Sequence, residues 1–171
     1  LQGTYLHDKE FLITGKTYEG NVGFHLVTPM KLVDGRTVLV KRGWIELKHR
    51  KPADTVPMHV EGIQTVDGLI RQDRLKGYFV PDNEQQNDVW LYIDTAEMAE
   101  ARDLGPVLPY FVDQLRAPGP LKMPIGADSE IHVRNEHLSY AATWALLALT
   151  LIVIYVIYHM KPEDETEPDR D

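Results

Sequence analysis

Residues 138–158 of this 171-residue chain carry no charged side chain and read LSYAATWALLALTLIVIYVIY. A helix of this length rises about 31 Å, enough to cross a hydrocarbon core of roughly 30 Å. The alternative is a helix buried in a protein core, which is usually shorter. Tyr140, Tyr155 and Tyr158 lie near the two ends of the run, where aromatic side chains gather at membrane interfaces. The run therefore predicts a single transmembrane helix.

This helix divides the chain into three parts. We expect a β-rich soluble domain over residues 1–133, the helix with its cap over residues 134–159, and an acidic disordered tail over residues 160–171. The chain begins with Leu1, and its first ten residues lack the basic segment and apolar run of a signal peptide. We therefore expect a fragment or trimmed form without its N-terminal anchor. The basic residues near the helix do not decide its orientation.

The strongest strand pattern in the soluble part is a predicted hairpin. Residues 38–45 (VLVKRGWI) begin with β-branched side chains and follow the turn signal Asp34-Gly35. Residues 22–30 (VGFHLVTPM) precede that turn, and Pro29 is expected to end their strand. The two segments should therefore pair as antiparallel strands.

A second strand and a short helix are predicted further along the chain. Residues 88–94 (DVWLYID) are apolar on both faces of a strand, which is typical of a central strand. Residues 95–102 read as a short helix that is capped by Asp94 or Thr95 and followed by Gly105. The fold class predicted is mainly β: an antiparallel domain, either a small barrel or a sandwich, with one short helix and a C-terminal transmembrane helix.

Composition excludes several classes of function. The net charge is −8, whereas a duplex-binding protein needs a basic patch, so no nucleic acid is expected as a partner. The chain has no cysteine, which excludes disulfides, thiolate zinc sites and cysteine nucleophiles. No pair of its histidines has the spacing of a helical zinc motif, and no serine elbow or phosphate-binding loop is present. The sequence therefore predicts a protein that is not an enzyme.

His137 stands at the start of the predicted transmembrane helix. Asn135 is a good N-cap residue, and Glu136 then lies in the first turn, where the helix dipole favours negative charge. The same dipole disfavours an imidazolium, and a neutral imidazole is the form that ligates iron. His137 is thus a candidate metal ligand.

At 100° per residue, His137 shares one stripe of this helix with Ala141, Trp144, Ala148 and Tyr155. The two alanines would let a flat ring or a second helix approach closely. The alternative is an interfacial histidine whose stripe packs on a neighbouring helix. The residues themselves favour neither alternative.

The basic pair Lys41-Arg42 interrupts an otherwise apolar strand and is followed by Gly43 and Trp44. Gly43 would allow a β-bulge that re-aims Arg42 or Trp44. Arg42 could hold a haem propionate or a partner carboxylate as a bidentate fork. It could instead pair with an acidic residue of the domain, and we favour this structural interpretation.

Several segments together resemble a known family. Residues 134–144 (RNEHLSYAATW) look like a C-terminal signature in which Asn-x-His-Leu-x-Tyr opens the helix. The other matching blocks follow in order, namely 3–10 (GTYLHDKE), 23–34 (GFHLVTPMKLVD), 38–44 (VLVKRGW), 68–71 (GLIR), 79–83 (FVPDN) and 90–99 (WLYIDTAEMA). The chain thus resembles the Surfeit locus protein family of cytochrome c oxidase assembly factors. It departs from the commoner residues of the family at Lys41 and Glu46.

The resemblance implies a function. Such a protein would be a membrane-anchored assembly factor for cytochrome c oxidase that binds haem a and assists its insertion into subunit I. The alternative is a scaffold that stabilises an oxidase assembly intermediate without binding haem. The expected partners are subunit I, assembly intermediates, haem a and membrane lipid.

The resemblance also implies site residues and a location. His137 corresponds to the family's membrane-helix histidine and would bind the haem iron, with Tyr140 and Trp144 beside it. Gly23, Arg42, Gly43 and Trp44 would serve a partner contact or the structure of the domain. The soluble domain is expected in the periplasm, anchored to the bacterial inner membrane, or alternatively at the mitochondrial inner membrane.

Overall fold

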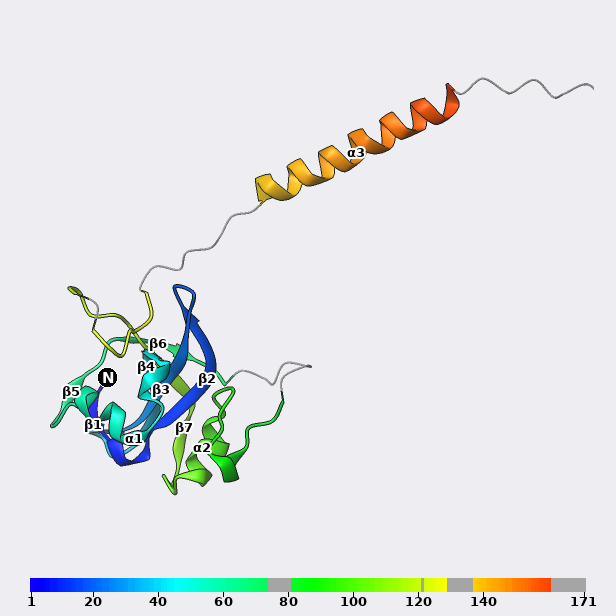
Figure 1. The fold of residues 1–171 in the computed structure, drawn as a ribbon. Coiled ribbons are helices and arrows are strands. Elements are labelled where there is room, and N and C mark those ends of the chain that lie inside the picture. Colours follow the sequence, from blue (N-terminus) through cyan, green and yellow to red (C-terminus); the bar gives the residue numbers. More distant parts are fainter. Residues whose placement is uncertain (74–80, 121, 129–136, 161–171) are drawn as a thin grey trace, which may run out of the picture. The chain divides into compact units, whose positions relative to one another are not determined.

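The computed structural model describes residues 1–73, 81–120, 122–128 and 137–160. Backbone contacts divide the chain into two units, residues 1–130 and residues 131–171, and each is described by itself. Figure 1 shows a β-rich first unit and a second unit that contains one long helix. The mainly β fold class and the C-terminal apolar helix are confirmed.

Seven strands form one half-barrel sheet in the first unit (Figure 1). The path across the sheet is β5-β1-β3-β4-β7-β6, and β2 also pairs with β3. The β4–β7 pair is parallel and the other pairs are antiparallel. The strands are β1 (Gln2–Tyr5), β2 (Phe11–Tyr18), β3 (Asn21–Leu32), β4 (Thr37–Glu46), β5 (Gln64–Thr65), β6 (Gly68–Arg71) and β7 (Val107–Gln114).

Short helical elements occupy the connections between strands. Two are α-helical, α1 (Pro52–Thr55) and α2 (Thr95–Ala101). Four are single 3₁₀ turns, η1 (His7–Lys9), η2 (Leu47–His49), η3 (Val56–Met58) and η4 (Gln85–Asn87). The predicted helix at residues 95–102 is α2, and the Asp94 carboxylate caps it by accepting from the Glu97 N–H at 2.9 Å. Cap and helix are therefore confirmed.

The predicted hairpin is β3–β4, and it turns at Asp34-Gly35 as expected. The prediction that Pro29 ends the first strand is wrong, because β3 continues to Leu32. The Pro29 carbonyl accepts from the Leu6 N–H at 2.8 Å, and Leu6 lies in the break between β1 and β2. An N–H at Pro29 would point to this same break, where no strand continues the ladder. Proline is therefore tolerated here despite its missing donor.

The bulge predicted at Gly43 is present. Leu26 is paired with Gly43, but Val27 is paired with Lys41, so Arg42 is the extra residue of β4. Gly43 has φ +140°, and a Cβ there would lie 2.1 Å from the Ile125 carbonyl oxygen. Only glycine satisfies both the backbone conformation and this close approach.

The core covers both faces of β4, which makes β4 the central strand. Its Leu39 packs into a cluster on one face, and Val38 and Val40 pack into a cluster on the other. Beyond the bulge, Ile45 joins Phe24 in a third cluster. Side chains of a regular strand alternate between its two faces, so without the bulge Trp44, and not Ile45, would share a face with Val40. The extra residue shifts the alternation by one and places Ile45 on the face of Val40.

The strand predicted at residues 88–94 is wrong. This segment makes only isolated bridges, one of them between Trp90 and Ile13 of β2. The side-chain oxygen of Asn83 accepts from the Leu91 N–H at 2.9 Å and satisfies backbone that a neighbouring strand would otherwise pair. Trp90 and Ile93 nevertheless enter the core, with Trp90 fully buried. The apolar pattern thus reports burial of an irregular segment, not a strand.

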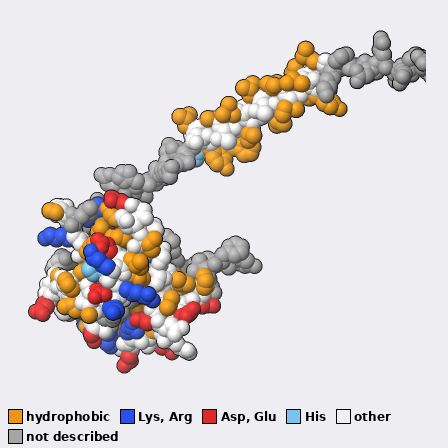
Figure 2. All heavy atoms as spheres, in the orientation of Figure 1, with side chains coloured by type: hydrophobic (Ala, Val, Ile, Leu, Met, Phe, Trp, Pro, Cys, Tyr) orange, Lys and Arg blue, Asp and Glu red, His pale blue; other side chains and the backbone are white. Residues whose placement is uncertain are grey.

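The uncharged C-terminal run forms one continuous helix, α3 (His137–His159). Its length and composition suffice to cross a membrane, and none of its residues is buried. Figure 2 shows hydrophobic side chains along the helix. The predicted start at Asn135 lies outside the described residues, as do residues 161–171 of the predicted tail.

Candidate functional site

The predicted haem-site residues lie in the first two turns of α3. His137 is its first residue and is exposed, as are Tyr140 and Trp144. The ring centroids of Tyr140 and Trp144 are 6.4 Å apart. Because α3 is regular, Ala141 and Ala148 fall on the same stripe as His137. The helix therefore brings these residues together on one surface.

The side chains on this surface can be compared with what haem binding requires. Haem iron is held by side chains such as histidine, cysteine, methionine or tyrosine, and the porphyrin needs apolar cover. The imidazole of His137 supplies the donor, and Trp144 with the small side chains of Ala141 and Ala148 supplies an exposed apolar face. The residues present thus fit one axial ligand and one face of the ring.

The second predicted cluster surrounds the β4 bulge, where the side chain of Arg42 is only 6% exposed. Its Nη2 donates to the Met58 carbonyl at 2.5 Å, and its Nη1 lies 3.4 Å from Glu10 Oε1. The guanidinium also lies 4.8 Å from the ring centroid of Tyr5. Arg42 is therefore directed into the domain and held there by an internal acid.

Burial perturbs the titration of this cluster. It raises the pKa of Tyr5 to about 12, an effect that the nearby Arg42 cation partly offsets. Burial also lowers the pKa of Arg42 from its ordinary value, and the negative charges of Tyr5, once it is ionised, and of Glu10 oppose that shift. At neutral pH Tyr5 is consequently neutral, and Arg42 remains a cation as arginine does in proteins.

Trp44 and Gly23 fit together on the far side of the bulge. A Cβ on Gly23 would lie 2.7 Å from the Trp44 indole, so glycine leaves room for this ring. Backbone hydrogen bonds of 2.8 Å in both directions join Trp44 to Ile125. The indole N–H donates to the Lys16 carbonyl at 3.3 Å. The predicted residues Gly23, Gly43 and Trp44 thus form one tightly packed junction.

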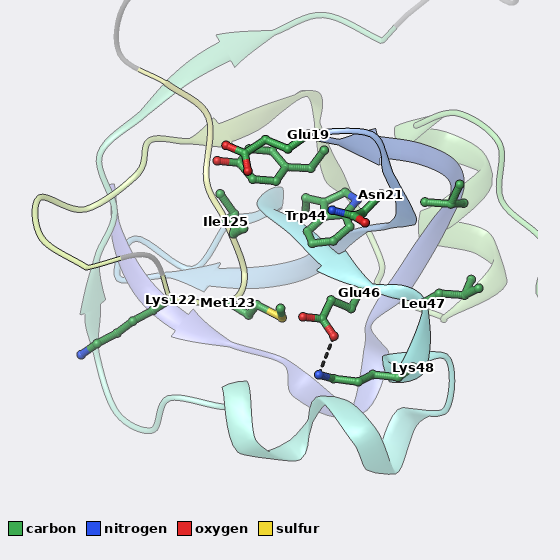
Figure 3. A pocket seen from close by; sticks show the side chains of 11 residues that line it. Glu19, Asn21, Trp44, Glu46, Leu47, Lys48, Lys122, Met123 and Ile125 are labelled. Atoms are coloured by element: carbon green, nitrogen blue, oxygen red, sulfur yellow. Dashed lines mark ion pairs between the residues drawn. The ribbon is translucent and has the colours of Figure 1, made fainter.

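A pocket of about 660 Å³ opens beside this junction (Figure 3). Trp44, Met123 and Ile125 lie along it together with Asn21. Charges of both signs lie at its edge, among them the ion pair between Glu46 and Lys48. The complete lining is Tyr18, Glu19, Asn21, Val22, Trp44, Glu46, Leu47, Lys48, Lys122, Met123 and Ile125. Such a mixed surface suits a peptide or protein segment better than a single small ion.

A third group of side chains gathers around Glu10, and the sequence did not indicate it. His7, Glu10 and His59 approach one another although β2, β3 and β4 separate the first two from the third in the chain. The side chain of Glu10 is only 9% exposed. The signal available was the short spacing His7-x-x-Glu10, which alone is too common to carry a prediction.

Comparison with known proteins identifies relatives over nearly the whole chain. The model of the SURF1 family matches residues 1–149. A SURF1-like protein of Monosiga brevicollis is 33% identical over 170 residues, covering 93% of this chain and 64% of the relative. A SURF1-like protein of Rickettsia felis is 30% identical over 162 residues, covering 92% and 71%.

Further matches come from animals. A SURF1-like protein of Caenorhabditis elegans is 30% identical over 174 residues, covering 90% of this chain and 53% of the relative. The chain therefore spans between about half and two thirds of the length of the first relatives it matches.

Proposed function

The chain belongs to the SURF1 family, and from this premise we propose that it is a membrane-anchored assembly factor for cytochrome c oxidase. The observation that carries the proposal is the match over residues 1–149, which includes both the β domain and the start of α3. A domain joined to an apolar helix suits a protein that works on a membrane enzyme while that enzyme is incomplete.

The role proposed is not enzymatic. A nucleophile paired with its base in a substrate cleft would support an enzyme. The proposal instead rests on binding: an apolar helix in the membrane and a domain with a mixed pocket outside it.

Within this role we propose that His137 binds haem a during its delivery to subunit I. When bound, haem a would supply a redox-active iron centre, and the His137 imidazole would hold that iron as a ligand. Trp144 and the small residues Ala141 and Ala148 would cover one porphyrin face, and Tyr140 would lie at its margin. Apolar contact with the ring would add affinity that does not depend on the iron.

A scaffold that never binds haem is the second candidate function. The observation that favours it is the pocket beside Trp44, which offers aromatic, apolar and charged groups to a segment of a partner. Subunit I or an assembly intermediate would then be held through the β domain. Haem binding by the purified protein separates this function from haem delivery.

We propose the bacterial inner membrane as the location, with the β domain in the periplasm. The Rickettsia felis relative is a bacterial protein, which supports this choice. The mitochondrial inner membrane is the alternative, supported by the relatives from eukaryotes.

Replacing His137 with alanine should weaken binding of haem a by at least about tenfold and shift its absorption spectrum. The estimate follows because losing even an outer-shell partner of a metal ligand costs about 10–100-fold in affinity. Titration of the protein in detergent with haem a, followed by its absorption bands, measures both effects. His159→Ala is the matched control, because it removes a histidine from the other end of the same helix.

Ala148→Leu should also weaken haem binding, because it places bulk on the stripe below His137. Equal affinities and spectra for the wild type, His137→Ala and His159→Ala would contradict the ligand role. If none of these proteins bound haem a, the scaffold function would be favoured.

A further inference from the structure

The side chains of His7, Glu10 and His59 converge in the β domain. Each offers one ligand atom, and these atoms all lie within 4.8 Å of one another. The exposed fractions of the side chains are 15%, 9% and 25%, so the group is half-buried but reachable from solvent. We propose that these three residues form a binding site for a divalent transition-metal ion of the zinc class.

The spacing of the donors suits such an ion. His7 Nδ1 lies 2.9 Å from Glu10 Oε1, and His59 Nε2 lies 3.5 Å from Glu10 Oε2. Two ligands bound at about 2.1 Å to a tetrahedral ion are about 3.4 Å apart. The two separations from Glu10 are therefore close to the spacing of ligands around one ion, and all three ligand atoms lie within 4.8 Å of one another.

The two carboxylate oxygens of Glu10 differ in their hydrogen-bond partners. Its Oε1 accepts from Thr28 Oγ1 at 2.9 Å and lies near Arg42 and His7. Its Oε2 is buried and has no hydrogen-bond partner among the described residues. An unpartnered buried carboxylate oxygen is costly, and it points toward His59 Nε2. A bound cation would satisfy it.

The backbone around His7 accommodates the tautomer that a metal requires. His7 Nε2 lies 3.1 Å from the Val60 N–H nitrogen and 3.0 Å from the Val60 carbonyl oxygen. In one tautomer Nε2 accepts from that N–H, and Nδ1–H donates to Glu10. In the other tautomer, Nε2–H donates to the Val60 carbonyl, and the lone pair of Nδ1 is available to bind the metal ion. Metal-binding histidines usually make this second kind of contact with their other nitrogen.

The charge of the site selects the class of ion. Arg42 Nη1 lies 3.4 Å from the same carboxylate and offsets its negative charge. An ion held mainly by charge, such as calcium or magnesium, would find little attraction here. Imidazole suits zinc, copper and nickel, so two histidines favour this class despite the nearby guanidinium.

The two imidazole rings are stacked, with centroids 4.0 Å apart and planes inclined by 13°. Ligands to one tetrahedral ion approach it from different directions. Binding should therefore rotate His7 and His59 away from the parallel stack. Glu10 and a solvent molecule would complete the coordination of the ion.

Zinc and cobalt titrations of the full chain in detergent test the proposal. One Zn²⁺ per chain should bind and raise the melting temperature of the β domain, and Co²⁺ should give the visible absorption of a low-symmetry site. His59→Ala should weaken Zn²⁺ binding at least about 100-fold, because losing an outer-shell partner alone costs about 10–100-fold. The His59 side chain lies 3.5 Å from both Glu10 Oε2 and Thr55 Oγ1, at the outer limit of hydrogen-bond distance, so this variant should fold.

Two further variants decide the outcome. Glu10→Gln keeps the size of the side chain and should also lose Zn²⁺ binding, whereas His49→Ala removes a histidine outside the cluster and should retain it. Melting curves in EDTA show whether each variant is folded. The proposal is overturned if the wild type binds no Zn²⁺, or if His59→Ala and His49→Ala bind it equally well.

Discussion

Replacing Arg42 with alanine should lower the free energy of unfolding of the β domain by about 3–5 kcal/mol. Removing one partner of a buried ion pair leaves the other charge without compensation, and losses of this size are typical. Here the residual charge is Glu10, whose side chain is 9% exposed. The Met58 carbonyl would lose its donor as well. Denaturant unfolding followed by tryptophan fluorescence measures the change.

Arg36→Ala is the matched control for Arg42→Ala. Arg36 pairs with Asp34 at 2.7 Å, but these side chains are 61% and 45% exposed, and such exposed pairs contribute little to stability. The double variant Arg42→Ala with Glu10→Gln should recover part of the loss, because no buried carboxylate is then left alone. If Arg42→Ala were as stable as Arg36→Ala, the structural role assigned to the buried pair would be wrong.

Replacing Trp90 with alanine should lower the free energy of unfolding by about 3–5 kcal/mol, the usual cost of removing a buried tryptophan. Trp90 is fully buried and packs edge-to-face on Phe11, with ring centroids 5.1 Å apart. Its indole N–H donates to Asp88 Oδ1 at 2.7 Å. The cavity left behind would lie at the centre of the cluster between the sheet and α2.

Two comparisons make the Trp90 result specific. Trp90→Phe keeps most of the packing and loses the bond to Asp88, so its loss of stability should be smaller. Trp144→Ala removes an exposed indole of α3 and should leave the unfolding of the β domain unchanged. A loss below about 1 kcal/mol for Trp90→Ala would show that the segment around it is not part of the cooperative core.

Features set by local rules could be predicted from the sequence. The α3 helix follows from the length of an uncharged run, and the β3–β4 hairpin follows from a turn dipeptide between β-branched segments. The bulge follows from Gly43, because a glycine inside a strand, here after a basic pair, often marks a bulge. Each of these rests on residues that are neighbours in the chain.

The errors in the fold have a shared cause. The pattern of residues 88–94 correctly indicates burial on both faces. Whether a buried segment is a strand, however, depends on which groups form hydrogen bonds with its backbone. The Asn83 side chain does so here, and no periodicity reveals that. The parallel pairing of β7 with β4 was also not predicted, since it joins segments far apart in sequence.

The candidate site was predictable to a similar degree. Arg42, Gly43 and Trp44 were selected because their residue types are unusual for a strand, and the structure shows what they contact. Their partners Glu10 and Met58 come from other elements, so the sequence alone could not name them. The same holds for His7 and His59, which meet only after folding. Haem binding at His137 stays a prediction.

The most direct test of the account is the amount of mature cytochrome c oxidase in cells that lack the gene for this chain. Reduced-minus-oxidised spectra of their membranes report haem a in the assembled enzyme. We predict that the haem a signal falls in the deletion strain, returns with the wild-type gene and returns only in part with His137→Ala. A normal haem a signal in the deletion strain would contradict the proposed role in oxidase assembly.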